Sequence, residues 1–315
     1  MIVQQISTEL GLSPGYLGKL ARTASFRYKK YSIKKRSGGE RLIHHPAREL
    51  KLVQRWLVEN ILFHLPVHPA ATAYRRGSSI RKNAALHANN NYVLRVDFQD
   101  FFPSLRRSDI IAVLQRHQET IARLALADED ISFITAIVSR EGGLVIGAPS
   151  SPVLSNALMF RFDEYCAREC LTMGVAYSRY ADDLYFSTNS PNVLSELLSK
   201  VRAHISQESS PRLQINEKKT VFTSKKRRRV VTGLTLTSDR KISIGRKRKR
   251  ILKSLVFRLL HEQIAPAQIR ELEGWVAYTR SVEPAFVASI ERKYHVNLEN
   301  EFLKRVNRQK SRPVS

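Results

Sequence analysis

Two adjacent aspartates, Asp182 and Asp183, have the spacing that most directly suggests chemistry in this sequence. They stand between two short β-rich runs in residues 175–188, which predicts a tight turn between antiparallel strands. Two carboxylates at one turn repel each other unless a cation lies between them. A third carboxylate, Asp97, ends another β-rich run, residues 92–98. If these strands are neighbours in one sheet, the three carboxylates converge and can hold two divalent ions.

Two divalent ions held in this way activate a hydroxyl oxygen, such as a 3′-oxygen, and stabilise pyrophosphate as it leaves. The alternative is that Asp182 and Asp183 are ordinary turn residues, because aspartate favours turns. The aspartate pair follows Asp97 by about eighty-five residues, and each carboxylate lies at the end of a predicted strand. This combination is more specific than an isolated acidic turn, and it favours nucleotidyl transfer.

The charge balance predicts a polyanionic partner. The chain has 315 residues, with 53 Lys and Arg against 28 Asp and Glu, a net charge of +25. An excess of this size indicates nucleic acid or an anionic membrane surface. No run of ~18 apolar residues predicts a membrane span, and the N-terminus lacks the basic and apolar regions of a signal peptide. Two cysteines predict a reducing compartment, so we expect a cytoplasmic nucleic-acid-binding protein without a membrane partner.

Turn signals and apolar periodicity predict an α+β chain whose last 70 residues are helical. A β-hairpin is expected early in the chain, and Ser108 and Ser151 are expected to cap the starts of two later helices. Leu154, Leu158 and Phe162 are expected on one buried stripe. The other predicted elements are a helical lead-in over residues 1–24, the β-hairpin over 26–45 turning at 37–39, a helix over 48–63, a hairpin over 230–244 turning at Ser238-Asp239, and helices from 246 onward.

Four segments resemble motifs of reverse transcriptases, and they occur in the same order. Tyr180-Ala181-Asp182-Asp183 resembles the Y-x-D-D signature of that family, and residues 96–105 (VDFQDFFPSL) resemble the motif that supplies its first metal ligand. Residues 147–152 (GAPSSP) resemble the loop-to-helix element under template and nucleotide. Residues 213–220 (LQINEKKT) resemble the lysine-bearing motif that follows.

Two further elements narrow the resemblance to the retron reverse transcriptases of bacteria. Asn83-Ala-Ala-Leu-His87 matches the N-A-x-x-H element of that subclass, and Val231-Thr232-Gly233 matches its V-T-G element. Each has a structural alternative, since Asn83 can cap a helix, His87 can be a satisfied buried side chain, and Thr-Gly is common at strand bends. The resemblance covers residues 25–300, and the 70 residues after Gly245 leave room for a thumb but not for an RNase H domain.

The resemblance implies a right-hand polymerase fold with fingers, a palm built on an antiparallel sheet, and a helical thumb. On this basis residues 1–24 form the N-terminal helical lead-in, residues 25–245 form fingers and palm, and residues 246–315 form a basic helical thumb. The fingers are expected mainly in 25–92 and 105–146, and the palm mainly in 93–104 and 147–245.

The resemblance also implies roles for individual residues in the site. Asp97, Asp182 and Asp183, with the backbone carbonyl of Phe98, are expected to bind two Mg²⁺ ions. The other expected site residues bind the incoming dNTP: Arg41 contacts its triphosphate, Phe102 excludes a ribose 2′-hydroxyl, and Lys218 or Lys219 protonates or neutralises the leaving pyrophosphate. The alternatives are that Arg41 is a solvated strand charge and that Phe102, like Phe101, packs in the core. The chain departs from many relatives at Ile146, where they carry glutamine before the G-A-P-S-S-P element.

The basic residues after position 224 are expected to bind RNA. Residues 225–253 hold thirteen Lys and Arg against one acid, Asp239. Such runs are often only a solvated surface, but here they flank the V-T-G element and open a helix with an apolar face. The residues expected to bind RNA are Asn83, His87, Val231, Thr232, Gly233, Arg246, Lys247, Arg248, Lys249 and Arg250.

A retron enzyme would reverse-transcribe part of a cognate structured non-coding RNA from the 2′-OH of an internal guanosine, giving a branched RNA–DNA product, msDNA. Such systems commonly act in antiphage defence with an accessory effector protein, and host RNase H would trim the template. The alternatives are a group II intron-like or diversity-generating reverse transcriptase, and a non-catalytic protein that binds structured RNA.

Overall fold

The computed structural model describes residues 2–34, 38–117, 126–208 and 210–310, with side chains as far as Lys304. The contacts divide the chain into two compact units, each made of two separate stretches. Unit 1 comprises Met1–Ser78 and Tyr92–Phe222, and unit 2 comprises Ser79–Asn91 and Thr223–Ser315. Residues 79–91 therefore interrupt unit 1 in the sequence and pack with the C-terminal part of the chain.

The central sheet has the strand order β4-β5-β3-β6. Its strands are β3 (Tyr92–Asp97), β4 (Ala176–Tyr180), β5 (Asp183–Thr188) and β6 (Val221–Ser224). β5 pairs antiparallel with both β3 and β4. The pairing of Tyr180 with Asp183 leaves only Ala181 and Asp182 in the connecting turn, as the sequence predicts. The strands form because apolar, mostly β-branched or aromatic residues fill their buried positions.

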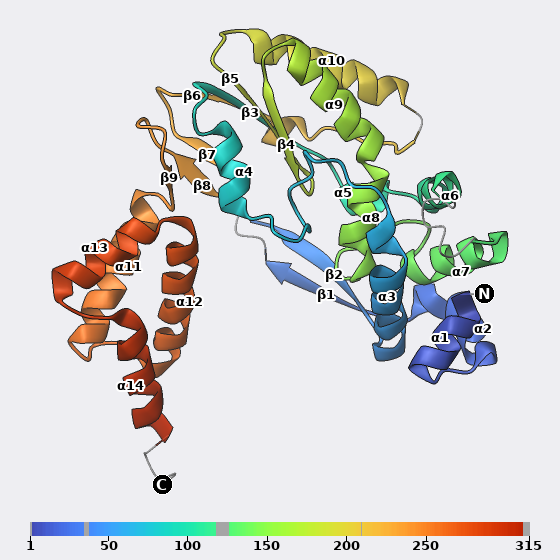
Figure 1. Ribbon diagram of the computed structural model, residues 1–315, viewed down its shortest axis with the longest axis horizontal. Helices are drawn as coiled ribbons and strands as arrows, with labels where there is room; N and C mark the ends of the chain where they lie inside the picture. Colours follow the sequence, from blue (N-terminus) through green and yellow to red (C-terminus); the bar gives the residue numbers. More distant parts are fainter. Residues whose placement is uncertain (1, 35–37, 118–125, 209, 311–315) are drawn as a thin grey trace. The chain divides into compact units, whose positions relative to one another are not determined.

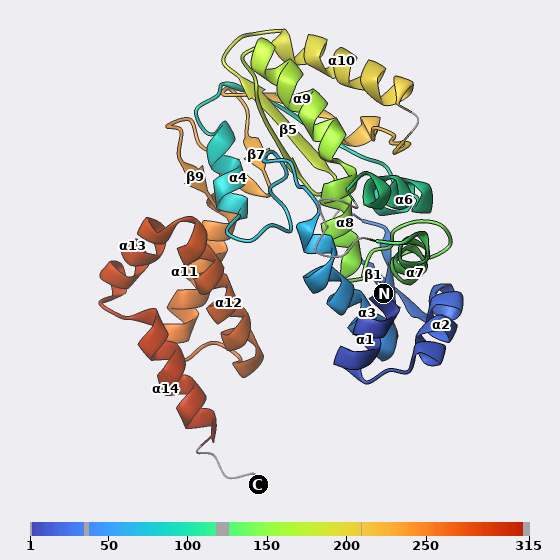
Figure 2. The same ribbon diagram turned by 45° about the vertical axis from the view of Figure 1, so that its right-hand side comes forward.

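Three helices pack along this sheet: α8 (Ser150–Leu158), α9 (Phe160–Thr172) and α10 (Val193–Gln207). α9 and α10 lie beside each other along β4 and β5 (Figures 1 and 2). Leu154, Leu158 and Phe162 are buried as predicted, but α8 and α9 are separate helices that join at Met159. The stripe therefore continues across a helix junction.

The N-terminal part of unit 1 contains the predicted hairpin, formed by β1 (Tyr28–Lys34) and β2 (Glu40–Pro46). The sequence predicted its turn at 37–39, of which Ser37 lies outside the described residues. Near the N-terminus, α1, α2 and α7 pack together (Figures 1 and 2). The remaining helices of unit 1 are α1 (Ile2–Leu10), α2 (Pro14–Thr23), α3 (Arg48–Asn60), α5 (Phe101–Ser104), α6 (Arg107–Arg116) and α7 (Asp128–Val138), with 3-10 turns η1 (Ala24–Phe26), η2 (Leu62–His64) and η3 (Glu217–Lys219).

Two predicted helix starts are wrong by one or two residues. α6 begins at Arg107 instead of being capped by Ser108, because the Asp109 carboxylate accepts a bond from the Arg106 amide at 2.6 Å. α8 begins at Ser150, so Ser151 lies inside its first turn, where its hydroxyl accepts a bond from the Val145 amide at 3.3 Å. In α6 a bond from the N-cap amide to the Asp109 carboxylate replaces the predicted serine cap. In α8 the Ser151 hydroxyl contacts the preceding loop instead of capping the helix.

Unit 2 joins a small sheet to a group of helices. Its three-stranded sheet has the order β7-β8-β9, where the sequence predicted a single hairpin turning at Ser238-Asp239. The difference arises because Thr232 and Gly233 have positive φ angles of 46° and 77° and make an additional turn. The elements are α4 (Ile80–His87), β7 (Arg229–Val231), β8 (Leu234–Leu236), β9 (Ile242–Ser243), α11 (Arg246–Leu260), α12 (Pro266–Val282), α13 (Pro284–Tyr294) and α14 (Leu298–Lys310).

α4 packs against the strands of the small sheet, so the two stretches of unit 2 share one core. The Thr232 hydroxyl donates to the Ile80 carbonyl at 3.1 Å, and the Arg229 guanidinium donates to the Asn90 carbonyl. No helix in the described part of the chain is both long and apolar enough to cross a bilayer.

Candidate active site

The three aspartates meet at one end of the central sheet. Asp97 at the end of β3 is the register partner of Asp183 at the start of β5, and Asp182 precedes it in the turn. The Phe98 amide donates to the Asp182 carbonyl at 3.2 Å, which ties the end of β3 to this turn. We call residues 181–183, with Asp97, the acidic bend. Its convergence follows directly from strand pairing, as the sequence argument required.

Basic side chains of the protein neutralise two of the three aspartates. The Lys219 ammonium lies 2.8 Å and 3.1 Å from the two carboxylate oxygens of Asp97. Arg95 Nε donates to Asp183 Oδ1 at 2.9 Å, and the Tyr185 hydroxyl donates to Asp183 Oδ2 at 3.2 Å. Lys219 thus faces the site, and Lys218 is exposed. Of the two candidate lysines, only Lys219 is placed to exchange partners with a bound cation.

Burial and the neighbouring carboxylates raise the pKa values of Asp182 and Asp183. Burial, followed by the charges of Asp183 and Asp97, raises the pKa of Asp182 to about 6. Burial also raises the pKa of Asp183, although the Arg95 charge opposes this shift. A cation close to all three would relieve the repulsion.

The donor set fits a divalent cation because carboxylate oxygens are the hard ligands that Mg²⁺ prefers. In the part of the chain that the structure describes, no three His, Cys, Asp or Glu side chains are grouped so that they could hold a metal directly. Asp97 and Asp183 are paired instead with Lys219 and Arg95. The fit therefore rests on the carboxylate chemistry of the three aspartates and on their adjacency in the sheet.

Arg41 and Tyr74 lie near the acidic bend. Burial raises the pKa of Tyr74, the charges of Asp182 and Tyr180 raise it further, and the nearby Arg41 lowers it. Arg41 is exposed on β2. The sequence analysis assigned no role to Tyr74, whose backbone has a φ of 58°.

Phe101 and Phe102 divide between core and site. Phe101 is 4% exposed and stacks on Phe98 with ring centroids 5.8 Å apart. Phe102 is half-buried and meets the Phe101 ring edge-on at 5.4 Å. Of the two rings, Phe102 is therefore the more accessible.

The G-A-P-S-S-P loop lies against the strand that carries Arg41. The His44 amide donates to the Ile146 carbonyl at 2.8 Å. A Cβ atom on Gly147 would lie 2.6 Å from the His44 carbonyl oxygen, so only glycine allows this approach. Ile146 joins the loop to β2 through its backbone, which any residue at this position would retain.

Comparison with known proteins identifies the family. The sequence profile of the reverse transcriptase (RNA-dependent DNA polymerase) family matches residues 33–236. The chain is 38% identical to the retron Ec83 reverse transcriptase of Escherichia coli over 270 residues, which cover 85% of this chain and 86% of that protein. It is 30% identical to the Escherichia coli retron Ec73 reverse transcriptase over 301 residues, or 93% and 95% of the two chains.

The chain belongs to the retron reverse transcriptases. It is therefore an RNA-directed DNA polymerase, as the motifs predicted. Among solved structures it is similar to telomerase from Candida albicans, with a TM-score of 0.50 and 11% identity over 88% of this chain and 59% of that one. Apo telomerase from Candida tropicalis gives a TM-score of 0.50 and 13% identity over 91% and 64%. These likenesses agree with the predicted right-hand polymerase fold, and the chain spans about three-fifths of either telomerase.

The two residues that mark the retron subclass lie in the core of unit 2. Asn83 and His87 on α4 have 0% exposed surface, and burial lowers the pKa of His87 to about 4. Val231 is also fully buried. Direct contact of these three side chains with RNA, as the sequence analysis expected, is inconsistent with this burial. The structural alternative, that these side chains are buried in the core, is confirmed. In this retron reverse transcriptase they contribute to the packing of unit 2.

The basic residues of unit 2 divide into structural and exposed groups. Arg229 is 1% exposed, and its guanidinium donates to the Thr237 carbonyl at 2.7 Å. Arg248 donates to the Gly233 carbonyl at 2.8 Å, and Lys249 forms an ion pair with Glu283. Within residues 225–253, the exposed basic residues are Lys225, Lys226, Arg227, Arg228, Arg240, Lys241, Arg246, Lys247, Arg250 and Lys253. Of the predicted V-T-G residues, Gly233 is exposed and Thr232 is partly exposed.

Sequence reasoning missed Arg95 and Tyr185, which hold Asp183 in this enzyme. One signal for Arg95 was available: in a strand, residues two apart share a face, so Arg95 had to project beside Asp97. Tyr185 has the same relation to Asp183. No local pattern indicated Tyr74, because its approach to the bend depends on tertiary packing.

Proposed function

We propose that this enzyme extends a primer hydroxyl by two-metal nucleotidyl transfer at the acidic bend, with Asp97, Asp182 and Asp183 as ligands of two Mg²⁺ ions. The observation that carries the proposal is the register pairing of Asp97 with Asp183 beside Asp182. Bound at these residues, with the Phe98 carbonyl as a further ligand, Mg²⁺ would supply activation of the hydroxyl and neutralisation of the leaving pyrophosphate.

The residues around the carboxylates prepare the site for that chemistry. Lys219 neutralises Asp97 in the resting protein, and a bound cation would replace its ammonium. The released ammonium is then free to neutralise pyrophosphate. Arg95 and Tyr185 occupy both oxygens of Asp183 and fix the orientation of that carboxylate.

The incoming dNTP would lie between the acidic bend and β2. The position of Arg41 supports this placement, because Arg41 and Asp182 both lie close enough to Tyr74 for their charges to shift its pKa. A guanidinium suits the triphosphate because it donates paired hydrogen bonds. Phe102 would lie under the sugar and exclude a 2′-hydroxyl, and the exposed Lys218 remains a secondary phosphate contact.

The cognate RNA would bind to the exposed basic residues of unit 2. They form a large excess of positive charge, and structured RNA is recognised mainly through its backbone and shape. In this proposal, residues 25–245 serve as fingers and palm and residues 246–315 as the thumb, with residues 1–24 as a lead-in. We further propose that the enzyme acts in the cytoplasm and that a 2′-OH of an internal guanosine primes its synthesis of msDNA. Antiphage defence, an accessory effector and template removal by host RNase H belong to the same proposal.

The test is nucleotide addition by Asp97→Asn protein purified with its bound RNA. We expect dNTP incorporation to fall by more than about 100-fold, because even residues that only orient metal ligands cost 10- to 100-fold when they are replaced. The amount of RNA that co-purifies should not change. The matched control is Asp100→Asn, an exposed aspartate three residues away that should retain activity. Wild-type incorporation by Asp97→Asn would reject the metal site. A non-catalytic RNA-binding protein predicts instead that both proteins bind RNA and that neither incorporates dNTP.

A further inference from the structure

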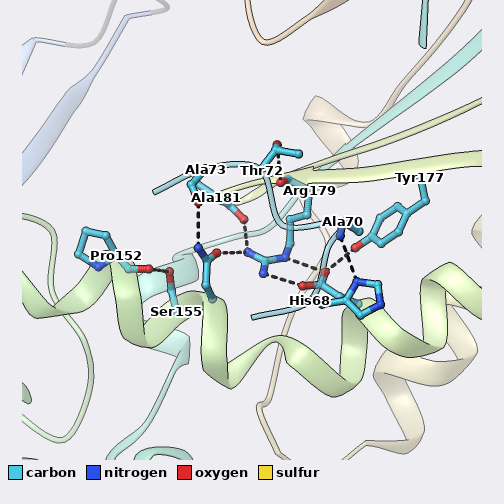
Figure 3. A network of polar contacts seen from close by, with 11 residues as sticks. His68, Ala70, Thr72, Ala73, Pro152, Ser155, Tyr177, Arg179 and Ala181 are labelled. Carbon is cyan, nitrogen blue, oxygen red and sulfur yellow. Dashed lines mark hydrogen bonds and ion pairs between the residues drawn. The ribbon is translucent and has the colours of Figure 1, made fainter. Parts of the chain in front are cut away.

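A completely buried ion pair lies behind the acidic bend. Arg179 on β4 and Asp163 on α9 are both 0% exposed. Arg179 Nε and Nη2 donate to the two carboxylate oxygens of Asp163 at 2.8 Å and 2.7 Å. The Tyr177 hydroxyl donates to the same carboxylate at 2.7 Å (Figure 3). The pair uses two of the three guanidinium nitrogens and leaves Nη1 for other partners.

Nη1 of Arg179 reaches the acidic bend itself. It donates to the Ala181 carbonyl at 3.1 Å and to the Asn156 side-chain oxygen at 3.3 Å. Figure 3 shows the guanidinium directed toward Ala181. Ala181 has a φ of 58°, a conformation that non-glycine residues adopt only when their surroundings hold them there. The Arg179 bond is one such constraint, and it acts on the residue immediately before Asp182.

The same network fixes the segment that leads to Tyr74. The Asn156 amide donates to the Ala73 carbonyl at 2.8 Å. The Thr72 amide and hydroxyl both donate to the Arg179 carbonyl, at 2.8 Å and 3.0 Å, and the Arg179 amide donates to the Ala70 carbonyl at 2.8 Å (Figure 3). Residue 179 is therefore bonded through its backbone to residues 70–72 and through its side chain to the bend.

We propose that Arg179 is a positioning residue for catalysis: held by Asp163 and Asn156, its guanidinium fixes the Ala181 carbonyl and thereby the direction of the Asp182 and Asp183 carboxylates. This role rests on the proposed metal site at those aspartates. Arg179 itself is completely buried, so it acts on substrate only through the bend. Ion pairing alone does not explain an arginine here, because apolar residues of similar volume often replace a buried pair without loss of stability. An apolar side chain cannot bond the Ala181 carbonyl.

The test replaces the pair without leaving a buried charge, in the double variant Arg179→Met/Asp163→Leu. We expect a thermal midpoint close to wild type, because packing is retained. Hydrogen exchange of the peptide spanning residues 179–184 should be at least about 10-fold faster, as expected of a locally loosened segment. The kcat on an annealed RNA template and DNA primer should fall by about 100-fold with unchanged KM for dNTP, since a displacement of about 1 Å costs that much.

A double variant with wild-type midpoint, bend exchange and kcat would overturn the proposal and leave the pair a structural element only. If the double variant does not reach the wild-type midpoint, Asn156→Ala decides, because it leaves the Arg179–Asp163 pair intact. Asn156→Ala should lower kcat by about 10-fold and accelerate exchange at the bend. Wild-type values for both would then overturn the proposal. Tyr165→Phe, on the same helix as Asp163 but bonded to Lys200, is the matched control with unchanged activity.

Asp182→Asn, measured in parallel, separates this inference from the proposed function. If Asp182→Asn is as active as wild type, the proposed metal site is wrong. The exchange rate of the bend peptide in the Arg179 and Asn156 variants still reports whether Arg179 holds the bend, because that measurement does not depend on catalysis.

Discussion

The acidic bend of unit 1 and the basic surface of unit 2 differ in how their charged side chains are arranged. At the bend, Asp97 and Asp183 each have a cationic partner within 3 Å, and Asp97 is only 3% exposed. In unit 2, residues 225–253 contain thirteen Lys and Arg and a single acid. Arg246, Lys247 and Arg250 are exposed there. One region fixes a few charges in a set geometry, and the other accumulates charge on its surface.

The proposed function explains this difference by what each region would recognise. Chemistry at a metal site requires carboxylates in defined directions, so bonds from Lys219, Arg95 and Tyr185 are useful before substrate arrives. RNA backbone is a repeating line of phosphates, so affinity depends on how many cations reach it. Salt should weaken the second interaction strongly and the buried contacts of the first much less.

The largest effect that separates the regions is expected from the triple variant Arg246→Ser/Lys247→Ser/Arg250→Ser. Loss of three phosphate contacts should lower RNA affinity by about 100-fold near physiological salt and reduce the slope of log K against log salt by roughly 2 to 3. The kcat on a short primer–template should not change. RNA binding measured across salt concentrations checks both quantities.

The control for that variant removes three exposed cations of unit 1, in Lys19→Ser/Arg22→Ser/Arg55→Ser. It changes the net charge equally but lies outside the proposed RNA surface. Equal losses of affinity in the two triple variants would mean that total charge, and not the surface of unit 2, determines RNA binding.

A single cation of unit 1 should affect rate and not affinity. Arg95→Met removes the partner of Asp183 Oδ1, and kcat should fall by about 30-fold, within the range for residues that orient metal ligands. RNA affinity should not change. Arg95→Lys should recover part of the rate because an ammonium can still pair with Asp183. Steady-state kinetics on one primer–template compares the three proteins, and wild-type kcat in Arg95→Met would refute a role in catalysis.

The sugar of the incoming nucleotide provides a smaller test of unit 1. Phe102→Val should raise the relative kcat/KM for rNTP by at least about 10-fold, because the space that a 2′-hydroxyl needs is opened. Phe101→Leu is the comparison, since Phe101 is 4% exposed within the core. Sugar selection measured with paired dNTP and rNTP substrates should change only in Phe102→Val, and unchanged selection in that variant would contradict the gate.

The smallest effect on activity is expected from replacing His87. This substitution should change only the pH dependence of the stability of unit 2. Burial lowers its pKa from 6.5 to about 4, so the folded state binds fewer protons than the unfolded state between these values. The stability contribution is therefore complete above pH 6.5 and is lost as pH falls toward 4. Going from pH 7.5 to 5.0 should cost about 2 kcal/mol, and His87→Gln should remove this dependence.

Urea unfolding followed through Trp275 of α12, in a Trp56→Phe background, measures the His87 effect at the two pH values. His261→Gln, an exposed histidine of the same unit, is the control and should keep the wild-type pH dependence. A wild-type pH dependence in His87→Gln would show that other groups cause the acid sensitivity of unit 2.

The sequence predicted the acidic bend well because its geometry follows from local rules. Asp97 ends a strand, Asp182 and Asp183 interrupt two others, and strand pairing then leaves few arrangements. The partners of the carboxylates were not predicted, because Lys219 and Arg95 are selected by tertiary packing among many basic side chains. The choice between Lys218 and Lys219 illustrates this, since adjacent lysines look alike until the 3-10 turn Glu217–Lys219 directs one of them to Asp97.

Burial explains where the sequence interpretation of unit 2 was wrong. Asn83 and His87 are polar and match a subclass motif, so they were expected at a surface that meets RNA. Both are fully buried, since the short helix α4 contributes to the core under the three-stranded sheet. The third strand itself was missed because Thr232 and Gly233 reverse the chain within what reads as one continuous β-rich run.

The division of unit 2 into two stretches has a consequence for how the chain matures during translation. Residues 79–91 leave the ribosome before the central sheet is complete, yet their partners begin only at Thr223. The 131 intervening residues take about 7 to 26 seconds to make at roughly 5–20 residues per second. During that delay α4 has no hydrophobic surface of its own unit to pack on. The last third of the chain therefore completes a unit whose first helix was synthesised before Asp97, Asp182 and Asp183.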